Sequence, residues 1–154
     1  MYPSAFDYHR PESVQDAVKI LQDNPEAKIL AGGHSLLPMM KLRLAVPGAL
    51  VDITRLSELP GVHEDGGDLI IGATTTYQQI LESDLIKQRL PVLSEAADVV
   101  GDVQVRNMGT IGGACAHCDP ASDFPAVVLA LDGQIKALGS SGERTQNAAE
   151  FFVD

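Results

Sequence analysis

Two pairs of adjacent glycines are the features of this sequence best suited to bind a ligand. The first pair lies in Ala31-Gly32-Gly33-His34-Ser35, after the apolar residues Ile29-Leu30, and the second lies in Thr110-Ile111-Gly112-Gly113. Glycine has no Cβ and reaches positive φ at little cost, so successive backbone N–H groups in such a turn can face one point. This arrangement binds anions, and a following helix N-terminus reinforces it. We therefore predict two turns that close together on one diphosphate.

The glycines alone leave a second interpretation open. Neither segment fits the G-x-G-x-x-G pattern or the P-loop pattern. Paired glycines are also common in turns that bind nothing. On the residues alone, both segments could be structural turns.

The elements expected around the first glycine pair form a small α/β lobe. Apolar residues at i, i+3, i+4 and i+7 predict a helix over 12–21, with Pro11 in its first turn. Short apolar runs predict strands at 28–31 and 49–53, with a helix over 36–44 between them. Strand, helix and strand in this order predict a first lobe over residues 1–55.

Residues 56–154 are predicted to form a second α/β lobe of the same domain, so that the fold class is α+β. Asp65-Gly66-Gly67 predicts a hairpin between strands 62–64 and 68–72. One of the threonines at 74–76 is expected to cap the helix over 77–81. The other expected elements are helices over 91–100 and 124–131, a strand over 134–138 and a helix from 148.

Composition limits the classes of partner. The chain has 154 residues, a net charge of −10 and a pI of about 4.6, which argues against nucleic acid. In an acidic chain that binds a phosphate group, most of the hydrogen bonds to the phosphate must come from backbone N–H groups. No apolar run approaches the roughly 20 residues of a membrane helix, and no signal peptide pattern is present. We therefore expect no membrane span, a cytoplasmic location and two cysteines that remain thiols.

The cluster Cys115-Ala116-His117-Cys118 could ligate a metal or form a redox dithiol. Structural zinc needs four ligands, usually in two separated pairs, and only one short cluster exists. We therefore assign no metal ligand. Instead, the small residues 114–116 are expected to let the backbone approach a ligand.

Single residues elsewhere have simpler expected roles. Arg106 is expected to form a structural salt bridge, because the chain is acidic. Met39 and Met40, at helical spacing beside Leu44, are expected in the core. Asp52 could cap the next turn or reach the site, and it is not assigned to the site.

Three separated motifs, in this order, resemble one family. They are Ala31-Gly32-Gly33-His34-Ser35-Leu36-Leu37-Pro38, Val105-Arg106-Asn107-Met108-Gly109-Thr110-Ile111-Gly112-Gly113 and Asp119-Pro120-Ala121-Ser122-Asp123. Together they resemble the FAD-binding medium subunit of the molybdenum hydroxylases, in particular the carbon monoxide dehydrogenase type, with xanthine dehydrogenase as a further member. The resemblance covers essentially the whole chain. It implies a two-lobed flavin-binding fold of the vanillyl-alcohol-oxidase (PCMH) type, with FAD between the lobes.

The resemblance also implies a binding site. Ala31, Gly32, Gly33, His34 and Ser35 would form one diphosphate loop, and Thr110, Ile111, Gly112 and Gly113 the other. Asp123 matches an acidic position that contacts the sugar or ribityl region. His34 would act through its backbone N–H, and no catalytic residue is assigned. Ala114 stands where many members have Asn, and the family's C-terminal domain is expected to be missing, because the chain stops after Phe151-Phe152-Val153-Asp154.

The implied role is electron transfer inside a larger oxidoreductase. An iron–sulfur small subunit would deliver electrons from a molybdenum-cofactor large subunit to FAD on this chain, and FAD would pass them to an acceptor such as NAD or a quinone. Two alternatives stay open at this point. The chain could be a truncated or degenerate binding module that holds flavin or another nucleotide weakly, or a nucleotide-binding α/β protein that does not use flavin.

Overall fold

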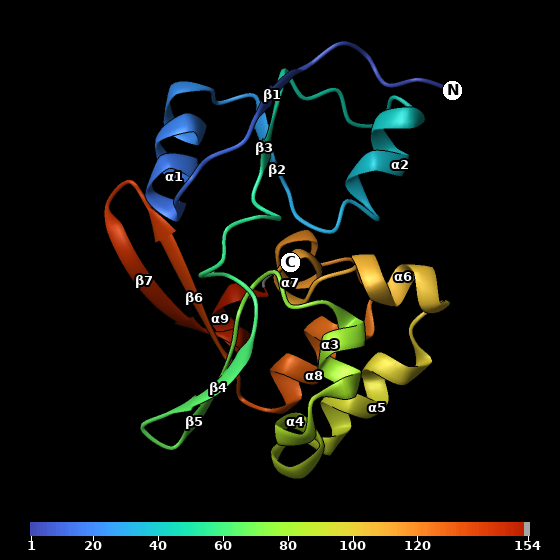
Figure 1. The fold of residues 1–154 in the computed structure, drawn as a ribbon, viewed down its shortest axis with the longest axis vertical. Helices are drawn as coiled ribbons and strands as arrows, with labels where there is room; N and C mark the ends of the chain where they lie inside the picture. Colours follow the sequence, from blue (N-terminus) through green and yellow to red (C-terminus); the bar gives the residue numbers. More distant parts are fainter. Residues whose placement is uncertain (153–154) are drawn as a thin grey trace.

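A three-stranded parallel sheet organises the first third of the chain. The computed structural model describes residues 1–152, and its first sheet has the order β1 (Asp7–His9), β3 (Ala49–Asp52), β2 (Ala27–Leu30). All four residues of the central strand β3 are buried, as expected for a parallel strand covered on both faces. The sheet is flanked by α1 (Val14–Asp23) and α2 (Leu36–Lys41) (Figure 1). Both expected strands and both expected helices of this region are therefore present.

Both helices of this region differ from the prediction in their bounds. Helix α1 begins two residues later than expected, because the Ser13 side chain accepts a hydrogen bond from the Asp16 N–H and caps the helix. Helix α2 ends at Lys41 rather than Leu44, since Arg43 takes a φ of 60°. Met40 is buried as predicted, whereas Met39, which was also expected in the core, is only partly buried. Leu44 follows the end of the helix and is 74% exposed.

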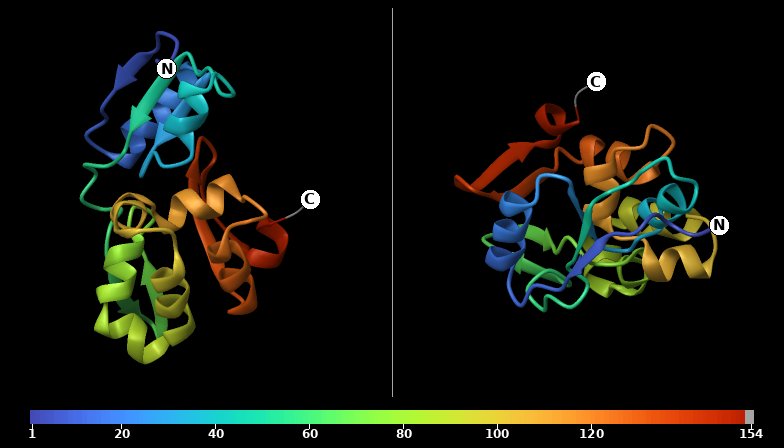
Figure 2. Two further views of the ribbon diagram at one scale, coloured as in Figure 1. Left: turned by 90° about the vertical axis from the view of Figure 1, so that its right-hand side faces the viewer. Right: turned by 90° about the horizontal axis from the view of Figure 1, so that it is seen from above.

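The rest of the chain is mostly helical, with two hairpins (Figures 1 and 2). The first hairpin pairs β4 (Val62–Asp65) with β5 (Asp68–Ile71), as predicted, and the second pairs β6 (Gln134–Gly139) with β7 (Gly142–Asn147). The helices are α3 (Tyr77–Glu82), α4 (Asp84–Arg89), α5 (Pro91–Val99), α6 (Val103–Met108), α7 (Ile111–His117), α8 (Asp123–Ala130) and α9 (Ala148–Phe151). Thr76 caps α3 through a complete capping box. Strands β1 and β7 and helices α4, α6 and α7 were not predicted.

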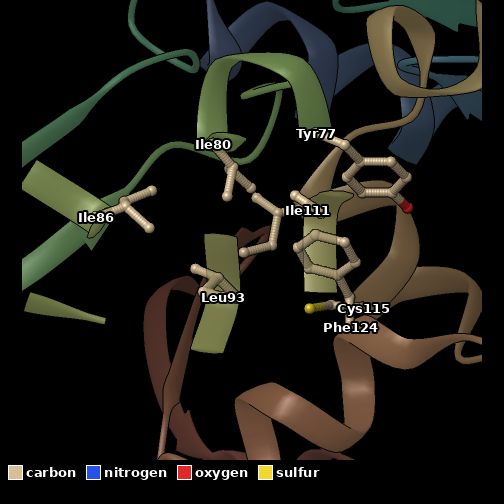
Figure 3. Close-up of a cluster of buried hydrophobic side chains, with 8 residues drawn as sticks. Tyr77, Ile80, Ile86, Leu93, Ile111, Cys115 and Phe124 are labelled. Atoms are coloured by element: carbon tan, nitrogen blue, oxygen red, sulfur yellow. The ribbon is translucent and has the colours of Figure 1, made fainter. Parts of the chain in front are cut away.

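The helical region has its own hydrophobic core. Figure 3 shows the ring of Tyr77 facing that of Phe124, and the two rings stack with their centroids 4.4 Å apart. The other core residues are Ile80, Ile86, Leu93, Ala97, Ile111 and Cys115. A smaller cluster of Ala17, Ala27, Ala49 and Val51 joins α1 to the parallel sheet. The fold is thus mixed α/β, as predicted, and within residues 1–152 no helix is long and apolar enough to cross a membrane.

Candidate cofactor-binding cleft

The segments that carry the two glycine pairs meet in the structure. The loop between β2 and α2 lies against the end of α6 (Figures 1 and 2), so closely that a Cβ on Gly32 would stand 1.8 Å from the Met108 carbonyl oxygen. The same Cβ would be 3.2 Å from the Cα of Gly109. Real Cβ atoms do not approach backbone this closely, so only glycine fits at position 32. The absence of a side chain here brings the two segments together.

A cleft of about 310 Å³ opens beside this contact. Its lining combines the end of β2, the turn after β3, the threonines before α3 and the junction of α6 with α7. The lining residues are Ala31, Gly32, Thr54, Thr74, Thr76, Asn107, Met108 and Thr110. Ala31, Gly32 and Thr110 were predicted as site residues, and the other five were not.

Free backbone N–H groups distinguish the first glycine loop. Within residues 1–152, none of the N–H groups of residues 32–36 donates a hydrogen bond to another protein group. Gly33 has a φ of +74°, and the chain then enters α2, where the Leu37 N–H donates to the Gly33 carbonyl at 2.9 Å. Consecutive unpaired amides next to a cleft are suited to an anionic ligand. His34 and Ser35 have exposed side chains, and the Ser35 hydroxyl does not cap α2.

The second glycine pair is built differently, and its prediction as a second turn is wrong, because it lies in a helix. Gly112 and Gly113 lie inside α7, which follows helix α6 and is capped by Thr110. The Ile111 N–H donates to the Thr75 carbonyl at 3.1 Å, and the Gly112 N–H donates to the Ala73 carbonyl at 2.9 Å. The Gly113 N–H donates to the Thr110 hydroxyl oxygen at 3.2 Å. These three amides therefore already have partners, and the group that this segment presents to the cleft is Thr110.

Two hydroxyl groups of the cleft are free to donate a hydrogen bond to a ligand. The buried Thr74 hydroxyl has no hydrogen-bond partner within residues 1–152. Thr110 accepts from Gly113, but its own proton is not donated within the same residues. A buried polar group without a partner costs about 1–3 kcal/mol. An acceptor on a ligand, such as a phosphate or carbonyl oxygen, would remove that cost at Thr74.

A carboxylate lies behind the cleft, at the carboxyl end of β3. Asp52 accepts hydrogen bonds from the Thr54 N–H at 2.9 Å, from the Thr54 hydroxyl at 2.7 Å, and from the Tyr8 hydroxyl. Burial raises the pKa of Asp52, but the hydrogen bonds from Tyr8 and Thr54 and the nearby charge of Arg10 outweigh it, so the pKa lies below the usual value. The hydrogen bond to Asp52 raises the pKa of Tyr8. Asp52 is therefore ionised at neutral pH and anchors Thr54.

Asp123 and Arg106 lie outside the lining of the cleft. Asp123 has an exposed side chain at the start of α8, and its contact with a cofactor stays a prediction. Arg106 forms no salt bridge within residues 1–152, so that prediction is wrong. Instead, its guanidinium donates to the Asp98 and Val100 carbonyls, both at 3.3 Å, at the end of α5.

The cysteine cluster also has a different role from the predicted one. Cys115 is buried in the core beside Phe124 (Figure 3) rather than giving the backbone access to the cleft. Burial, and next the neighbouring Cys118, raise the pKa of the Cys115 thiol to about 11, so it stays protonated at neutral pH. Within residues 1–152 no group of three or more His, Cys, Asp or Glu side chains is arranged to hold a metal ion.

Sequence reasoning could have found two of the missed residues. Asp52 and Thr54 follow a buried parallel strand directly, and ligands of such sheets bind beyond the carboxyl ends of the strands. Thr74 and Asn107 gave no comparable signal, because nothing in their neighbours distinguishes a cleft residue from a loop residue.

The comparison with known proteins identifies the family. Residues 4–154 match the model of the FAD binding domain in molybdopterin dehydrogenase. This chain belongs to that family. Its cofactor is FAD, and the unpaired amides at 32–36 and the free Thr74 hydroxyl suit the phosphate groups of that cofactor.

Individual relatives agree with this assignment. The chain is 49% identical over 154 residues to the carbon monoxide dehydrogenase medium chain of Hydrogenophaga pseudoflava, with 99% of this chain and 54% of the relative covered. It is 47% identical to the glyceraldehyde dehydrogenase medium chain of Sulfolobus acidocaldarius, with 99% and 54% covered. The chain thus spans about half the length of the curated relatives it matches.

Solved structures share the fold. Carbon monoxide dehydrogenase from Hydrogenophaga pseudoflava gives a TM-score of 0.97 at 49% identity, over 99% of this chain and 54% of that chain. Quinoline 2-oxidoreductase from Pseudomonas putida 86 gives a TM-score of 0.95 at 34% identity, over 100% and 56%.

Proposed function

We propose that this chain is the FAD-binding component of a molybdenum-containing oxidoreductase. The main observation in support of this proposal is the row of unpaired backbone N–H groups at residues 32–36, next to a cleft lined by hydroxyl groups. When bound, FAD supplies the redox chemistry, receiving electrons from iron–sulfur clusters of a partner subunit and passing them to an acceptor such as NAD or a quinone. The relatives named as medium chains of dehydrogenases support this role.

The residues of this chain bind and orient the cofactor. The N–H groups of Gly32, Gly33, His34 and Ser35 hold the diphosphate, beside Ala31, and the hydroxyls of Thr74 and Thr110 donate to it. Backbone and hydroxyl donors carry no net charge, so they bind a doubly charged diphosphate in a chain whose net charge is −10. Ile111, Gly112 and Gly113 contribute through their engaged amides, which hold Thr110 at the cleft.

The larger arrangement is proposed from the resemblance. Residues 1–55 and 56–154 form the two lobes of a flavin-binding fold of the vanillyl-alcohol-oxidase (PCMH) type, with FAD between them. Asp123 contacts the sugar or ribityl region. An iron–sulfur small subunit and a molybdenum-cofactor large subunit are the partners, and the complex is cytoplasmic. The mixed α/β fold and the names of the relatives support this arrangement.

Retention of flavin tests the proposal. The purified chain is mixed with FAD and passed through gel filtration, and flavin absorbance at about 450 nm is measured in the protein fraction. We expect FAD to stay with the protein and its fluorescence to change on binding. If neither happens, the chain is the alternative, a module that keeps the fold but holds flavin weakly.

A further inference from the structure

The cleft contains one hydroxyl group whose hydrogen-bonding direction is already fixed. Thr54 lines the cleft, and its hydroxyl proton is donated to Asp52 at 2.7 Å. The Thr54 N–H donates to the same carboxylate oxygen at 2.9 Å, while the Tyr8 hydroxyl donates to the other one. A hydrogen bond from a hydroxyl to a carboxylate is among the strong ones. The hydroxyl of Thr54 therefore does not turn its proton toward the cleft.

The other threonines of the cleft are in different states. Thr74 and Thr110 have protons that no group within residues 1–152 accepts. The Thr76 hydroxyl donates to the Gln79 side chain at 3.2 Å and accepts from the Gln79 N–H at 3.2 Å, so it is committed to the cap of α3. A hydroxyl has one proton and two lone pairs. Thr54 alone among these four gives its proton to a carboxylate and keeps both lone pairs for a ligand.

We propose that Thr54 accepts a hydrogen bond from a hydroxyl or N–H group of the bound cofactor, and that Asp52 and Tyr8 hold it in this orientation. The proposal rests on the proposed function of the cleft. A phosphate oxygen is an acceptor, and it would face the lone pairs of Thr54 without a proton between them. The sugar and ring portions of a flavin dinucleotide have O–H and N–H groups. Thr54 therefore marks a part of the cleft that takes a sugar or ring, while the free amides and Thr74 take the diphosphate. Asp52 and Tyr8 are positioning residues.

The sequence offers well-matched variants for a test. Thr54 is an exposed residue, so the substitution Thr54→Val is tolerated. It keeps the shape of the side chain and the N–H that donates to Asp52, and it loses the hydroxyl. Thr54→Ser keeps the hydroxyl. Thr145, exposed on β7 and outside the cleft lining, provides the control Thr145→Val. FAD affinity is measured for each variant from the change in flavin fluorescence, and the urea unfolding of the ligand-free proteins is measured in parallel.

We expect Thr54→Val to weaken FAD binding by about 3- to 10-fold, the contribution of one hydrogen bond. Thr54→Ser should restore affinity to within about 2-fold, and Tyr8→Phe should weaken it by a smaller factor than Thr54→Val. Thr145→Val should bind FAD and unfold like the wild type. Thr54→Val and Tyr8→Phe should both unfold at lower urea than the wild type, because each loses a hydrogen bond to Asp52.

Each other outcome overturns the proposal. If the wild type binds FAD and Thr54→Val binds it equally well, Thr54 does not contact the cofactor, while the proposed function stands. If Thr54→Val and Thr54→Ser are equally weak, or if Tyr8→Phe, which loses a hydrogen bond to the same carboxylate, weakens FAD binding as much as Thr54→Val, the role of Thr54 is structural. If the wild type binds no FAD, the proposed function fails first, and this inference fails with it.

Discussion

The two glycine pairs look alike in the sequence and do opposite things in the structure. At Gly32-Gly33 the backbone leaves a strand, the amides of residues 32–36 stay unpaired, and the loop lies on the backbone of Met108. At Gly112-Gly113 the backbone is helical, and the amides donate to Ala73 and to the cap residue Thr110. One pair leaves its donors available for a ligand, and the other uses them to join α7 to the turn before α3.

The difference lies in the amides rather than in the glycines. Both Gly32 and Gly112 are required for close backbone contact, since a Cβ would meet Met108 O at 1.8 Å in one case and Ala73 O at 2.6 Å in the other. A glycine pair therefore indicates a close approach of something to the backbone. Whether that is a ligand or another part of the chain depends on which N–H groups remain free.

The largest effect on stability is expected at Gly112. In Gly112→Ala the new Cβ would lie 2.6 Å from Ala73 O and 2.7 Å from Ala73 Cβ, so backbone must move. Overpacking of this kind costs typically 1–3 kcal/mol, and we expect the free energy of unfolding to fall by about 2–3 kcal/mol. Urea unfolding of the ligand-free protein measures it.

Gly113→Ala is the matched control in the same helix turn. Its Cβ would meet only the side-chain oxygen of Thr110, at 2.8 Å. The gain in helix propensity and the weakened cap, each about 1 kcal/mol, oppose one another, so the net change should stay within about 1 kcal/mol. Equal losses in both variants would mean that the contact with Ala73 does not distinguish Gly112.

The first pair should show its effect in cofactor binding. Gly32→Ala places a Cβ against the Met108 carbonyl, so the loop must shift away from Met108 and its free amides must change position. Losing one or two hydrogen bonds to charged phosphate, at about 1.5–3 kcal/mol each, lowers FAD affinity by about 10- to 100-fold. Titration of flavin fluorescence measures it.

Gly33→Ala tests whether the backbone conformation of this loop, rather than its contact with Met108, determines FAD affinity. Gly33 has a φ of +74°, and its nearest neighbours are ends of the Leu30 and Leu37 side chains, which can move. An alanine there costs about 1 kcal/mol of conformational strain, with a smaller loss of FAD affinity than Gly32→Ala. A larger loss for Gly33→Ala would show that loop conformation, and not contact with Met108, sets the affinity.

Sequence patterns predicted the elements that bury one face of a helix and those that are joined by characteristic turn residues. The stripe of Val14, Ala17, Val18 and Leu21 marked α1, and Asp65-Gly66-Gly67 marked the β4–β5 hairpin. Strand β7 was missed because its residues are nearly all exposed, and it exists through pairing with β6 rather than through its own apolar residues. Strand β1 is three residues long and depends on β3 in the same way.

Prediction of the site was limited in the same way, by contacts between segments that are far apart in the sequence. The first glycine loop was predictable because its strand, glycines and helix are contiguous. The local structure at Gly112 was not, since α7 is held by the carbonyls of Ala73 and Thr75, which are nearly forty residues earlier in the chain. The cleft threonines 54, 74 and 110 come from three separate segments, so their proximity is a property of the fold.

The smallest effect is expected from His34, and it tests whether the first loop binds through its backbone. In His34→Ala the N–H stays in place, and the exposed imidazole is the only group removed. FAD affinity should change by less than about 2-fold, well below the loss in Gly32→Ala, because a backbone donor does not depend on the side chain. The measurement is the same fluorescence titration, with His63→Ala, an exposed histidine of β4 outside the cleft lining, as the control. If His34→Ala lost more affinity than Gly32→Ala, the imidazole and not the amide row would be the main contact, and the contrast between the two glycine pairs would no longer explain where the cofactor binds.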